Sequence, residues 1–237
     1  MSGFFITGTD TGVGKTWVAA GLLHAVNAHG LRSAAMKPVA CGAVSTPHGP
    51  RNEDALLLMQ HAALRADYAR VNPFLFEPPI APHIAAHAAR RRIDIALIKT
   101  EFLALARAAN CVVVEGVGGW QVPLNERDSA ADLAAALELP VILVVGMRLG
   151  CLNHALLSAD AIARRGVSLA GWIANAIDPA FAELEQNITA LAQRIAAPLV
   201  GRVPYLREFD ATAIAAALDV QKLLAQPTHQ PVRPTRA

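Results

Sequence analysis

Cysteine is scarce in this sequence, with three residues in 237. The odd number and wide spacing of Cys41, Cys111 and Cys151 predict neither a disulfide framework nor a zinc site, so a reducing cytoplasm is the simplest expectation. Long hydrophobic runs are also missing: the longest, residues 139–147, is far shorter than the ~20 residues that span a bilayer. The N-terminus lacks a charged region followed by an apolar one. We therefore expect no signal peptide and no membrane partner.

The sequence also has no large excess of positive or negative charge, because the net charge is only +2. The basic residues are scattered, and their one cluster, the arginines at 90–92, fits the solvated end of a helix. We therefore expect no nucleic-acid partner. Apolar residues, in contrast, make up 54% of the chain, which is enough to build a large core in one α/β domain.

Residues 8–16, with the sequence GTDTGVGKT, lie between an apolar run and a helical segment. A strand, a glycine-rich turn and a helix are the setting of a phosphate-binding P-loop, whose backbone N–H groups and helix N-terminus hold phosphate oxygens. Lys15 would reach the β- and γ-phosphates of a nucleoside triphosphate, and Thr16 would bind Mg²⁺. The strict pattern has its first glycine at position 9, where this chain has Thr9. An ordinary glycine-rich turn is the alternative interpretation.

Short β-rich runs alternate with alanine-rich helical segments along the chain. The strands are expected over residues 3–7, 33–37, 111–115, 141–145, 169–175 and 199–203. The helices are expected over residues 16–29, 53–64, 82–90, 95–109, 129–138, 152–165, 181–195 and 210–225. This alternation predicts a single-domain, P-loop NTPase-like α/β fold over residues 1–225, with a mostly parallel, doubly wound sheet and helices on both faces. Residues 226–237 lack an apolar face and are expected to form a disordered tail.

Polar residues stand at the carboxyl ends of three expected strands: Lys37, Glu115 and Asn175. Ligands of such sheets bind beyond the carboxyl ends of the strands, so we expect these residues to converge with the P-loop. Glu115 could hold Mg²⁺, or it could simply end a strand before a flexible glycine turn. Lys37 could neutralise the charge on a transferred phosphoryl group or an anionic acceptor, or it could merely reach solvent.

Two further segments keep a structural and a functional interpretation open. Asp54 could be a second carboxylate for Mg²⁺, or it could complement the helix dipole with Asn52 as the N-cap. The helix start at 149–154, led by Gly150, could bind a carboxylate through its N–H groups, or it could be a plain turn. Ser129 and Asp132 have the spacing of a capping box, which we interpret as structural.

Together these motifs resemble the dethiobiotin synthetase family of biotin biosynthesis over residues 3–206. The resemblance rests on segments 8–16, 37–39, 51–54, 82–83, 115–119, 140–144, 149–154 and 171–175. It implies a homodimeric, ATP- and Mg²⁺-dependent ligase that converts 7,8-diaminononanoate and CO₂ into dethiobiotin. One amine would take up CO₂ as a carbamate, and the carbamate oxygen would attack the γ-phosphate to give a carbamic–phosphoric anhydride. The second amine would then close the ring and expel phosphate.

The resemblance also implies a role for each matching residue. The catalytic residues would be Lys37, Lys15 and Thr11, and the metal ligands Thr16, Asp54 and Glu115. ATP would contact Gly12, Val13, Gly14, Lys15, Thr16, Trp17, Asp54, Glu115, Gly116, Val117 and Gly118. The adenine would lie against Asn175, Ala176, Pro204, Tyr205 and Leu206. The substrate would contact Cys41 and, across the dimer, Gly150, Cys151, Leu152 and Asn153.

Two departures and one rival bear on this resemblance. Related sequences carry a hydroxyl residue at position 41, so the thiol of Cys41 puts that substrate contact in doubt. The similarity fades after Leu206, so contacts from residues 207–212 stay unassigned. The rival is a switch ATPase of the ParA or MinD type, which places chromosomes or septa. Such proteins carry a lysine near the start of the P-loop, and residues 8–11 here contain none.

Overall fold

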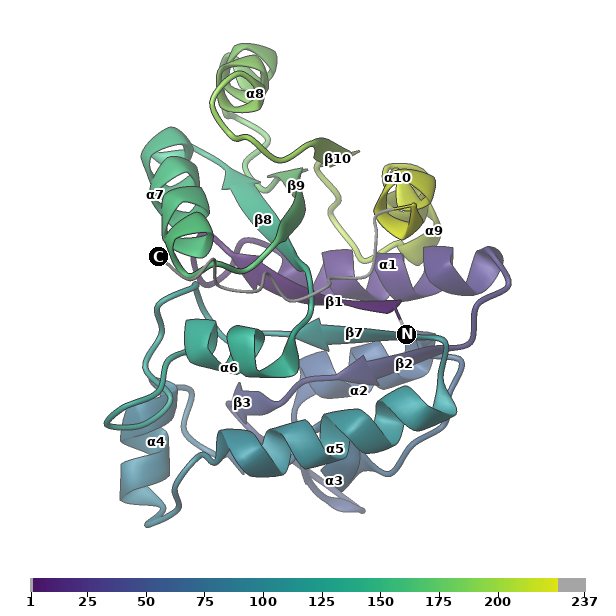
Figure 1. Cartoon of the computed structure of the whole chain (residues 1–237), viewed down its shortest axis with the longest axis vertical. Helices are drawn as coiled ribbons and strands as arrows, with labels where there is room; N and C mark the ends of the chain where they lie inside the picture. Colours follow the sequence, from purple (N-terminus) through teal and green to yellow (C-terminus); the bar gives the residue numbers. More distant parts are fainter. Residues whose placement is uncertain (1, 226–237) are drawn as a thin grey trace, which may run out of the picture.

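Six parallel strands form the central sheet of the protein (Figure 1). The computed structural model describes residues 2–225, so the expected tail at 226–237 lies outside the described residues. The strand order is β10-β9-β8-β1-β7-β2, and each neighbouring pair is parallel. The strands are β1 (Ser2–Gly8), β2 (Ser33–Met36), β7 (Cys111–Glu115), β8 (Val141–Met147), β9 (Leu169–Ala176) and β10 (Leu199–Val203). The predicted parallel sheet is confirmed.

Helices cover both faces of this sheet and can be followed in Figure 1. One face carries α1 (Lys15–Ala28), α2 (Glu53–His61), α9 (Ala211–Ala216) and α10 (Val220–Leu224). The other carries α4 (Pro82–Ala88), α5 (Ile95–Ala108), α6 (Ala130–Leu137), α7 (Cys151–Arg164) and α8 (Leu184–Ala192). The short helix α3 (Tyr68–Val71) packs against α5 and β2. The doubly wound arrangement predicted from the sequence is therefore present.

Successive strand residues point alternately into two hydrophobic cores. On β1, Phe4 and Ile6 pack with α1 while Phe5 belongs to the opposite core. On β7, Val113 and Val114 divide in the same way. Because both faces are buried, most positions of these strands are apolar, and polar residues such as Thr7 and Glu115 stand near the carboxyl ends. This burial explains the near-continuous hydrophobic runs in the sequence.

The segment between β2 and α4 contains small elements that the sequence analysis missed. Strand β3 (Val39–Cys41) pairs in parallel with β6 (Phe74–Phe76), and β4 (Val44–Thr46) forms a hairpin with β5 (Gly49–Arg51). Strands of three residues are too short to show a readable period. This segment nevertheless shapes the site described below.

The single helix predicted over residues 210–225 is wrong, because the chain breaks into α9 and α10. Leu218 lies between them and pairs with Gly201 on the edge strand β10. Asp219 then caps α10 by accepting a hydrogen bond from the Lys222 N–H at 3.0 Å. The pairing of Leu218 with β10 therefore covers part of the open edge of the sheet.

Candidate active site

Strand register brings Lys37 and Glu115 together at the carboxyl edge of the sheet. Met36 on β2 lies opposite Val114 on β7, so the next residues of the two segments are Lys37 and Glu115. Glu115 also lies opposite Ile6 of β1, where the chain is about to enter the P-loop. The Nζ of Lys37 is 2.6 Å from Oε1 of Glu115, which makes this a close ion pair.

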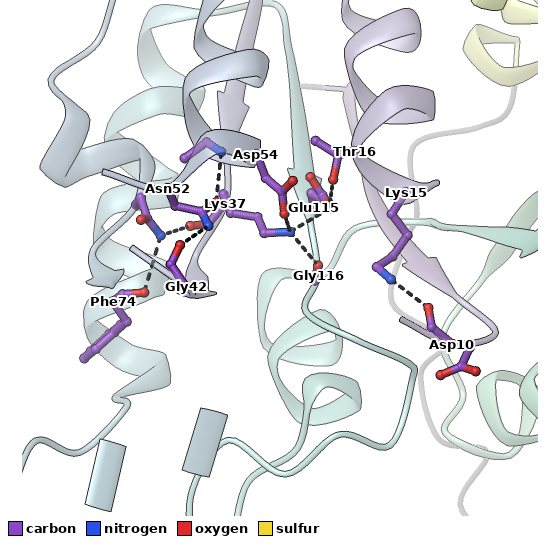
Figure 2. Close-up of polar contacts among 12 residues, drawn as sticks. Asp10, Lys15, Thr16, Lys37, Gly42, Asn52, Asp54, Phe74, Glu115 and Gly116 are labelled. Atoms are coloured by element: carbon purple, nitrogen blue, oxygen red, sulfur yellow. Dashed lines mark hydrogen bonds and ion pairs between the residues drawn. The ribbon is translucent and has the colours of Figure 1, made fainter. Parts of the chain in front are cut away.

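Asp54 and Thr16 complete a polar cluster around this pair (Figure 2). Asp54 lies in the first turn of α2, and its Oδ2 is 3.1 Å from Lys37 Nζ. Helix α2 begins at this position because the side chain of Asn52 accepts the Ala55 N–H, as predicted for an N-cap. The Thr16 hydroxyl, at the start of α1, donates to Glu115 Oε1 at 2.9 Å. Four segments, α1, α2, β7 and the residue after β2, thus bring their side chains to one point.

Within residues 3–225, the buried charged side chains are Lys15, Lys37 and Glu115, and all three belong to this cluster. Burial disfavours the charged form of Lys37, but Glu115 and Asp54 more than offset it and raise the pKa of that lysine. Lys37 therefore stays an ammonium ion with its counter-charges in place. Buried charge concentrated in one place is typical of a functional site.

Lys15 is in a different electrostatic position. Burial lowers its pKa to about 8, and attraction to Glu115 only partly opposes that shift. Its Nζ donates to the backbone oxygen of Asp10 at 2.8 Å, while the Asp10 carboxylate accepts from Arg148 at 2.7 Å. Figure 2 shows Lys15 pointing toward Asp10, away from Lys37. A buried lysine that lacks a direct carboxylate partner is suited to receive an anionic ligand.

One carboxylate oxygen of Glu115 is available to accept a further ligand. Its Oε2 is buried without a hydrogen-bond partner in the described part of the chain. A carboxylate oxygen of this kind, with the Asp54 carboxylate and the Thr16 hydroxyl nearby, is the set of oxygen ligands that Mg²⁺ takes. The residues present therefore fit a magnesium ion.

The P-loop glycines have clear structural reasons. Gly14 adopts φ +84° as the N-cap of α1, and a Cβ there would collide with the Asn175 amide. That amide donates to the Val13 carbonyl at 2.8 Å and ties the loop to β9. At Gly8 a Cβ would lie 2.7 Å from the Val13 side chain. A side chain at position 8 would have to displace the Val13 side chain, so glycine suits this position, one residue before the strict pattern has it.

A cavity of about 820 Å³ opens in front of these groups. Most of the residues predicted for the site line it: Thr11, Gly12, Gly14, Lys15, Thr16, Trp17, Lys37, Cys41, Asp54, Glu115, Val117, Gly118, Asn175, Ala176, Pro204, Tyr205 and Leu206. They come from distant parts of the sequence, and the carboxyl edge of the sheet collects them.

Two predicted contacts, Val13 and Gly116, do not line this cavity. The Val13 side chain is buried in the core behind the P-loop. Gly116 lies close against β1, where its N–H donates to the Ile6 carbonyl at 2.9 Å and a Cβ would meet the Phe5 ring at 3.0 Å. Both residues support the site from behind.

Gly150, Cys151, Leu152 and Asn153 also lie outside the cavity of this subunit. They begin α7, and the Cys151 side chain is buried in the core. Their predicted substrate contact requires a second subunit and stays a prediction.

Several lining residues were not identified from the sequence. They share small or apolar side chains at the ends of strands and in a proline-rich turn: Ala40, Pro79, Ile80, Ala81, Pro82, Val122, Ile177 and Val203. Asn52 lines the cavity as well, although the sequence suggested only a helix cap. The run of prolines at 78–82 was the one available signal, because it marks a rigid turn between β6 and α4.

The fold and the loop after β1 define a class of protein: a P-loop nucleotide-binding α/β protein. A septum site-determining protein MinD, determined with Mg-ADP from Pyrococcus horikoshii OT3, is similar with a TM-score of 0.57 and 15% identity, over 95% of this chain and 90% of that one. A ParA family ATPase from Chlorobium tepidum is similar with a TM-score of 0.53 and 14% identity, over 94% and 92%. At such identities the likeness concerns the fold alone.

Sequence comparison identifies the family. A family model described as AAA domain matches residues 2–213. An ATP-dependent dethiobiotin synthetase BioD of Pseudomonas paraeruginosa is 52% identical over 94% of this chain and 98% of its own length. One from Xanthomonas axonopodis pv. citri is 48% identical over 92% and 98%. The chain belongs to the ATP-dependent dethiobiotin synthetases, a family of ATP-dependent ligases. No helix within residues 2–225 is long and apolar enough to cross a membrane.

Proposed function

We propose that this protein forms dethiobiotin from 7,8-diaminononanoate, CO₂ and ATP, with release of ADP and phosphate. The observation that carries the proposal is the polar cluster itself, in a chain about half identical to named dethiobiotin synthetases. Two buried lysines of opposite electrostatic character, Lys15 and Lys37, face one cavity of about 820 Å³. Such a site can hold a triphosphate and an anionic acceptor side by side.

The proposed reaction begins when one amine of the diamine adds to CO₂ and loses a proton, giving a carbamate. A carbamate oxygen attacks the γ-phosphorus, and the bond from that phosphorus to the β,γ-bridging oxygen breaks, so ADP leaves. The second amine then attacks the carbonyl carbon of the mixed anhydride, loses a proton and expels phosphate. Both bond-forming steps need close positioning and charge stabilisation.

The residues divide this work by their charge and place. Lys15 binds the β- and γ-phosphates, which supply the direct anionic partner that it lacks among residues 2–225. Lys37 faces the carbamate and the phosphoryl group in transfer, with its ammonium held by Glu115 and Asp54. The Thr11 hydroxyl, at the mouth of the loop, donates to the carbamate. Cys41 lines the substrate side of the cavity, beside Lys37.

Thr16, Asp54 and Glu115 would hold Mg²⁺. The buried Oε2 of Glu115, which has no hydrogen-bond partner in residues 2–225, supports this role. The ion would neutralise charge on the β- and γ-phosphate oxygens. The Lys37–Glu115 pair keeps one carboxylate oxygen occupied and directs the other to the cation.

The opposite end of the cavity suits the nucleoside. Ala176, Pro204, Tyr205 and Leu206 form a mostly apolar wall there, as an adenine ring requires. Asn175 lies beside them, although its Nδ2 already donates to the Val13 carbonyl. We propose that it contacts the adenine edge through its remaining polar atoms.

A homodimer would complete the substrate site. Leu149 is 91% exposed and Leu157 is 61% exposed, and both flank or lie on α7, which begins at the Gly150 turn. We propose that these two leucines contribute to the interface between the subunits. The substrate carboxylate would then meet the α7 start at Gly150–Asn153 of the second subunit. The free thiols of Cys41 and Cys151 agree with a reducing cytoplasm as the compartment.

The test is to incubate the purified protein with ATP, Mg²⁺, bicarbonate and 7,8-diaminononanoate and to follow products by mass spectrometry. Dethiobiotin should appear together with ADP and phosphate, and ADP formation should depend on the diamine. ATP hydrolysis that is indifferent to the diamine would contradict the proposal and favour the switch-ATPase alternative.

A further inference from the structure

A continuous chain of hydrogen bonds links the peptide groups of Lys37 and Asn52. The Asn52 N–H donates to the Tyr68 hydroxyl at 2.7 Å, and that hydroxyl donates to Asn72 Oδ1 at 2.9 Å. Asn72 Nδ2 then donates to the Lys37 carbonyl at 2.6 Å. Each N–H or O–H group in this series donates, and each oxygen accepts, so the three hydrogen bonds can polarise and strengthen one another.

The chain is buried at its critical members. Asn72 is 3% exposed, Asn52 is 6% exposed and Lys37 is 4% exposed. A buried polar group that loses its partner is costly, so the three bonds are expected to form together or fail together. Tyr68, the central member, is partly buried, and so are the two hydrogen bonds that its hydroxyl makes.

Each end of the chain fixes a segment that carries a site residue. At one end, the Lys37 N–H also donates to the Val71 carbonyl at 2.9 Å, so both peptide groups of Lys37 are attached to the α3 region. At the other end, Asn52 caps α2 two positions before Asp54, and its Nδ2 donates to Gly42 at 3.2 Å (Figure 2). The α3 region therefore spans the two segments that bear Lys37 and Asp54.

We propose that Tyr68 and Asn72 are positioning residues, which hold Lys37 and Asp54 at their working separation without touching the substrates. The bond between Lys37 Nζ and Asp54 Oδ2 is 3.1 Å, and Asp54 is the more exposed partner, with 44% of its side chain accessible. The salt bridge alone cannot fix the two backbones, because an exposed carboxylate exchanges readily with water. The hydrogen-bond chain supplies that constraint. This inference rests on the proposed function, in which Lys37 faces the reacting groups.

The structure offers a variant that removes one hydroxyl and, with it, two of the three hydrogen bonds. Tyr68→Phe deletes the hydroxyl and keeps the ring, which the Arg51 guanidinium covers at 4.2 Å from the centroid. Asn72→Asp is a second variant, because aspartate still accepts from Tyr68 but has no N–H for the Lys37 carbonyl.

A matched control lies at the far ends of the same two elements. Asn27 Nδ2 donates to the carbonyl of His61, where α2 ends, and Asn27 Oδ1 accepts from Ser33, where β2 begins. Asn27→Ala thus removes two comparable bonds between α2 and β2 without changing their site ends.

The experiment measures dethiobiotin turnover, ATP affinity and thermal unfolding for the wild type and the three variants. We expect Tyr68→Phe and Asn72→Asp to lower kcat by about ten- to hundredfold, the scale of a displacement near 1 Å, with the Kd for ATP changed less than about threefold. Asn27→Ala should lower the unfolding temperature to a similar degree and leave kcat nearly unchanged.

The outcomes distinguish a failure of the positioning role from a failure of the proposed function. Equal loss of kcat in Asn27→Ala and Tyr68→Phe, or full kcat in Tyr68→Phe, would overturn the positioning role. A tenfold loss of affinity for ATP measured without Mg²⁺ would also overturn it, because the three hydrogen bonds involve no residue of the P-loop. A wild type that forms no dethiobiotin would contradict the proposed function instead.

Discussion

Two lysines of the site share one cavity but differ in almost everything that surrounds them. Lys37, after β2, meets two carboxylates and keeps its proton, because Glu115 and Asp54 outweigh the effect of burial on its pKa. Within the described residues 2–225, the ammonium group of Lys15, in the P-loop, donates only to a backbone carbonyl, and burial lowers its pKa to about 8. The protein has neutralised one buried charge internally and left the other for a ligand.

This difference suggests separate roles for the two lysines: Lys15 in nucleotide binding and Lys37 in the chemical step. A lysine without a counter-ion gains most when phosphates arrive, so Lys15 should govern nucleotide affinity. A lysine already paired gains little from binding, but it can shift its hydrogen bonds toward charge that develops during transfer. Substitutions in the site test whether the two lysines differ in this way.

The largest effect is expected from Lys37→Met. Removing one partner of a buried pair leaves Glu115 uncompensated, so the free energy of unfolding should fall by about 3 kcal/mol. Dethiobiotin turnover should fall by about 10²-fold or more, while ATP still binds. Denaturant unfolding, turnover and calorimetric ATP titration measure these three quantities.

The double variant Lys37→Met with Glu115→Gln is the control for this prediction. It removes both buried charges and should recover part of the lost stability. A single variant as stable as the wild type would show that Lys37 does not neutralise Glu115.

Lys15→Met should act in the opposite direction on stability. Its pKa falls from 10.5 to about 8 on folding, which corresponds to a cost of about 3 kcal/mol as an upper bound at neutral pH. Between these values the unfolded chain binds more protons than the folded one, so wild-type stability should rise with pH. Lys15→Met should therefore be the more stable protein at pH 7, and its advantage should shrink between pH 8 and 10.5.

Unfolding curves at several pH values, with chelator and without nucleotide, give the difference between the two proteins. A difference that does not change with pH would mean that Lys15 keeps an ordinary pKa.

Glu115→Gln should weaken the binding of Mg²⁺ at the site. We expect the half-saturating Mg²⁺ concentration to rise at least about tenfold, a loss typical of a disturbed metal site. Glu138→Gln is a matched control, because Glu138 pairs with Lys99 at the surface, away from the cavity. An unchanged Mg²⁺ titration in Glu115→Gln would remove it from the ligand set.

The smallest effect is expected from Cys41→Ser. Burial raises the pKa of the Cys41 thiol, so it is neutral and a weak hydrogen-bond donor. A serine hydroxyl should leave the KM for the diamine unchanged or lower it by less than about threefold. Cys41→Ala serves as the comparison without a donor, and a higher KM for serine than for alanine would show that position 41 makes no polar contact.

The predictable part of the molecule is the part with local patterns. The P-loop, the apolar strands and the polar residues that end them are contiguous signals, and the sheet collects them at one edge. The sequence did not reveal that β7 lies between β1 and β2, although this order is what sets Lys37 against Glu115. Strand order depends on packing between distant segments.

Tyr68 and Asn72 escaped prediction for a related reason. They lie in and just after a four-residue helix, among strands of three residues, where no periodicity can emerge. The helix predicted over 210–225 failed because Leu218 pairs with β10, a tertiary contact that overrides local propensity. Most of the residues that line the cavity could be predicted from the sequence, whereas Tyr68 and Asn72, the proposed positioning residues, could not.

The contrast between the two lysines is tested most directly by proton uptake when Mg-ATP binds. Calorimetric titration at pH 8.5, in buffers of different ionisation enthalpy, measures the protons taken up on binding. With Lys15 near pKa 8 in the free protein, phosphate binding should draw a substantial fraction of a proton from the buffer. The uptake should be smaller in Lys37→Met, because the charge of Lys37 helps to lower the pKa of Lys15. Binding of Mg-ATP to the wild type without proton uptake would contradict the account.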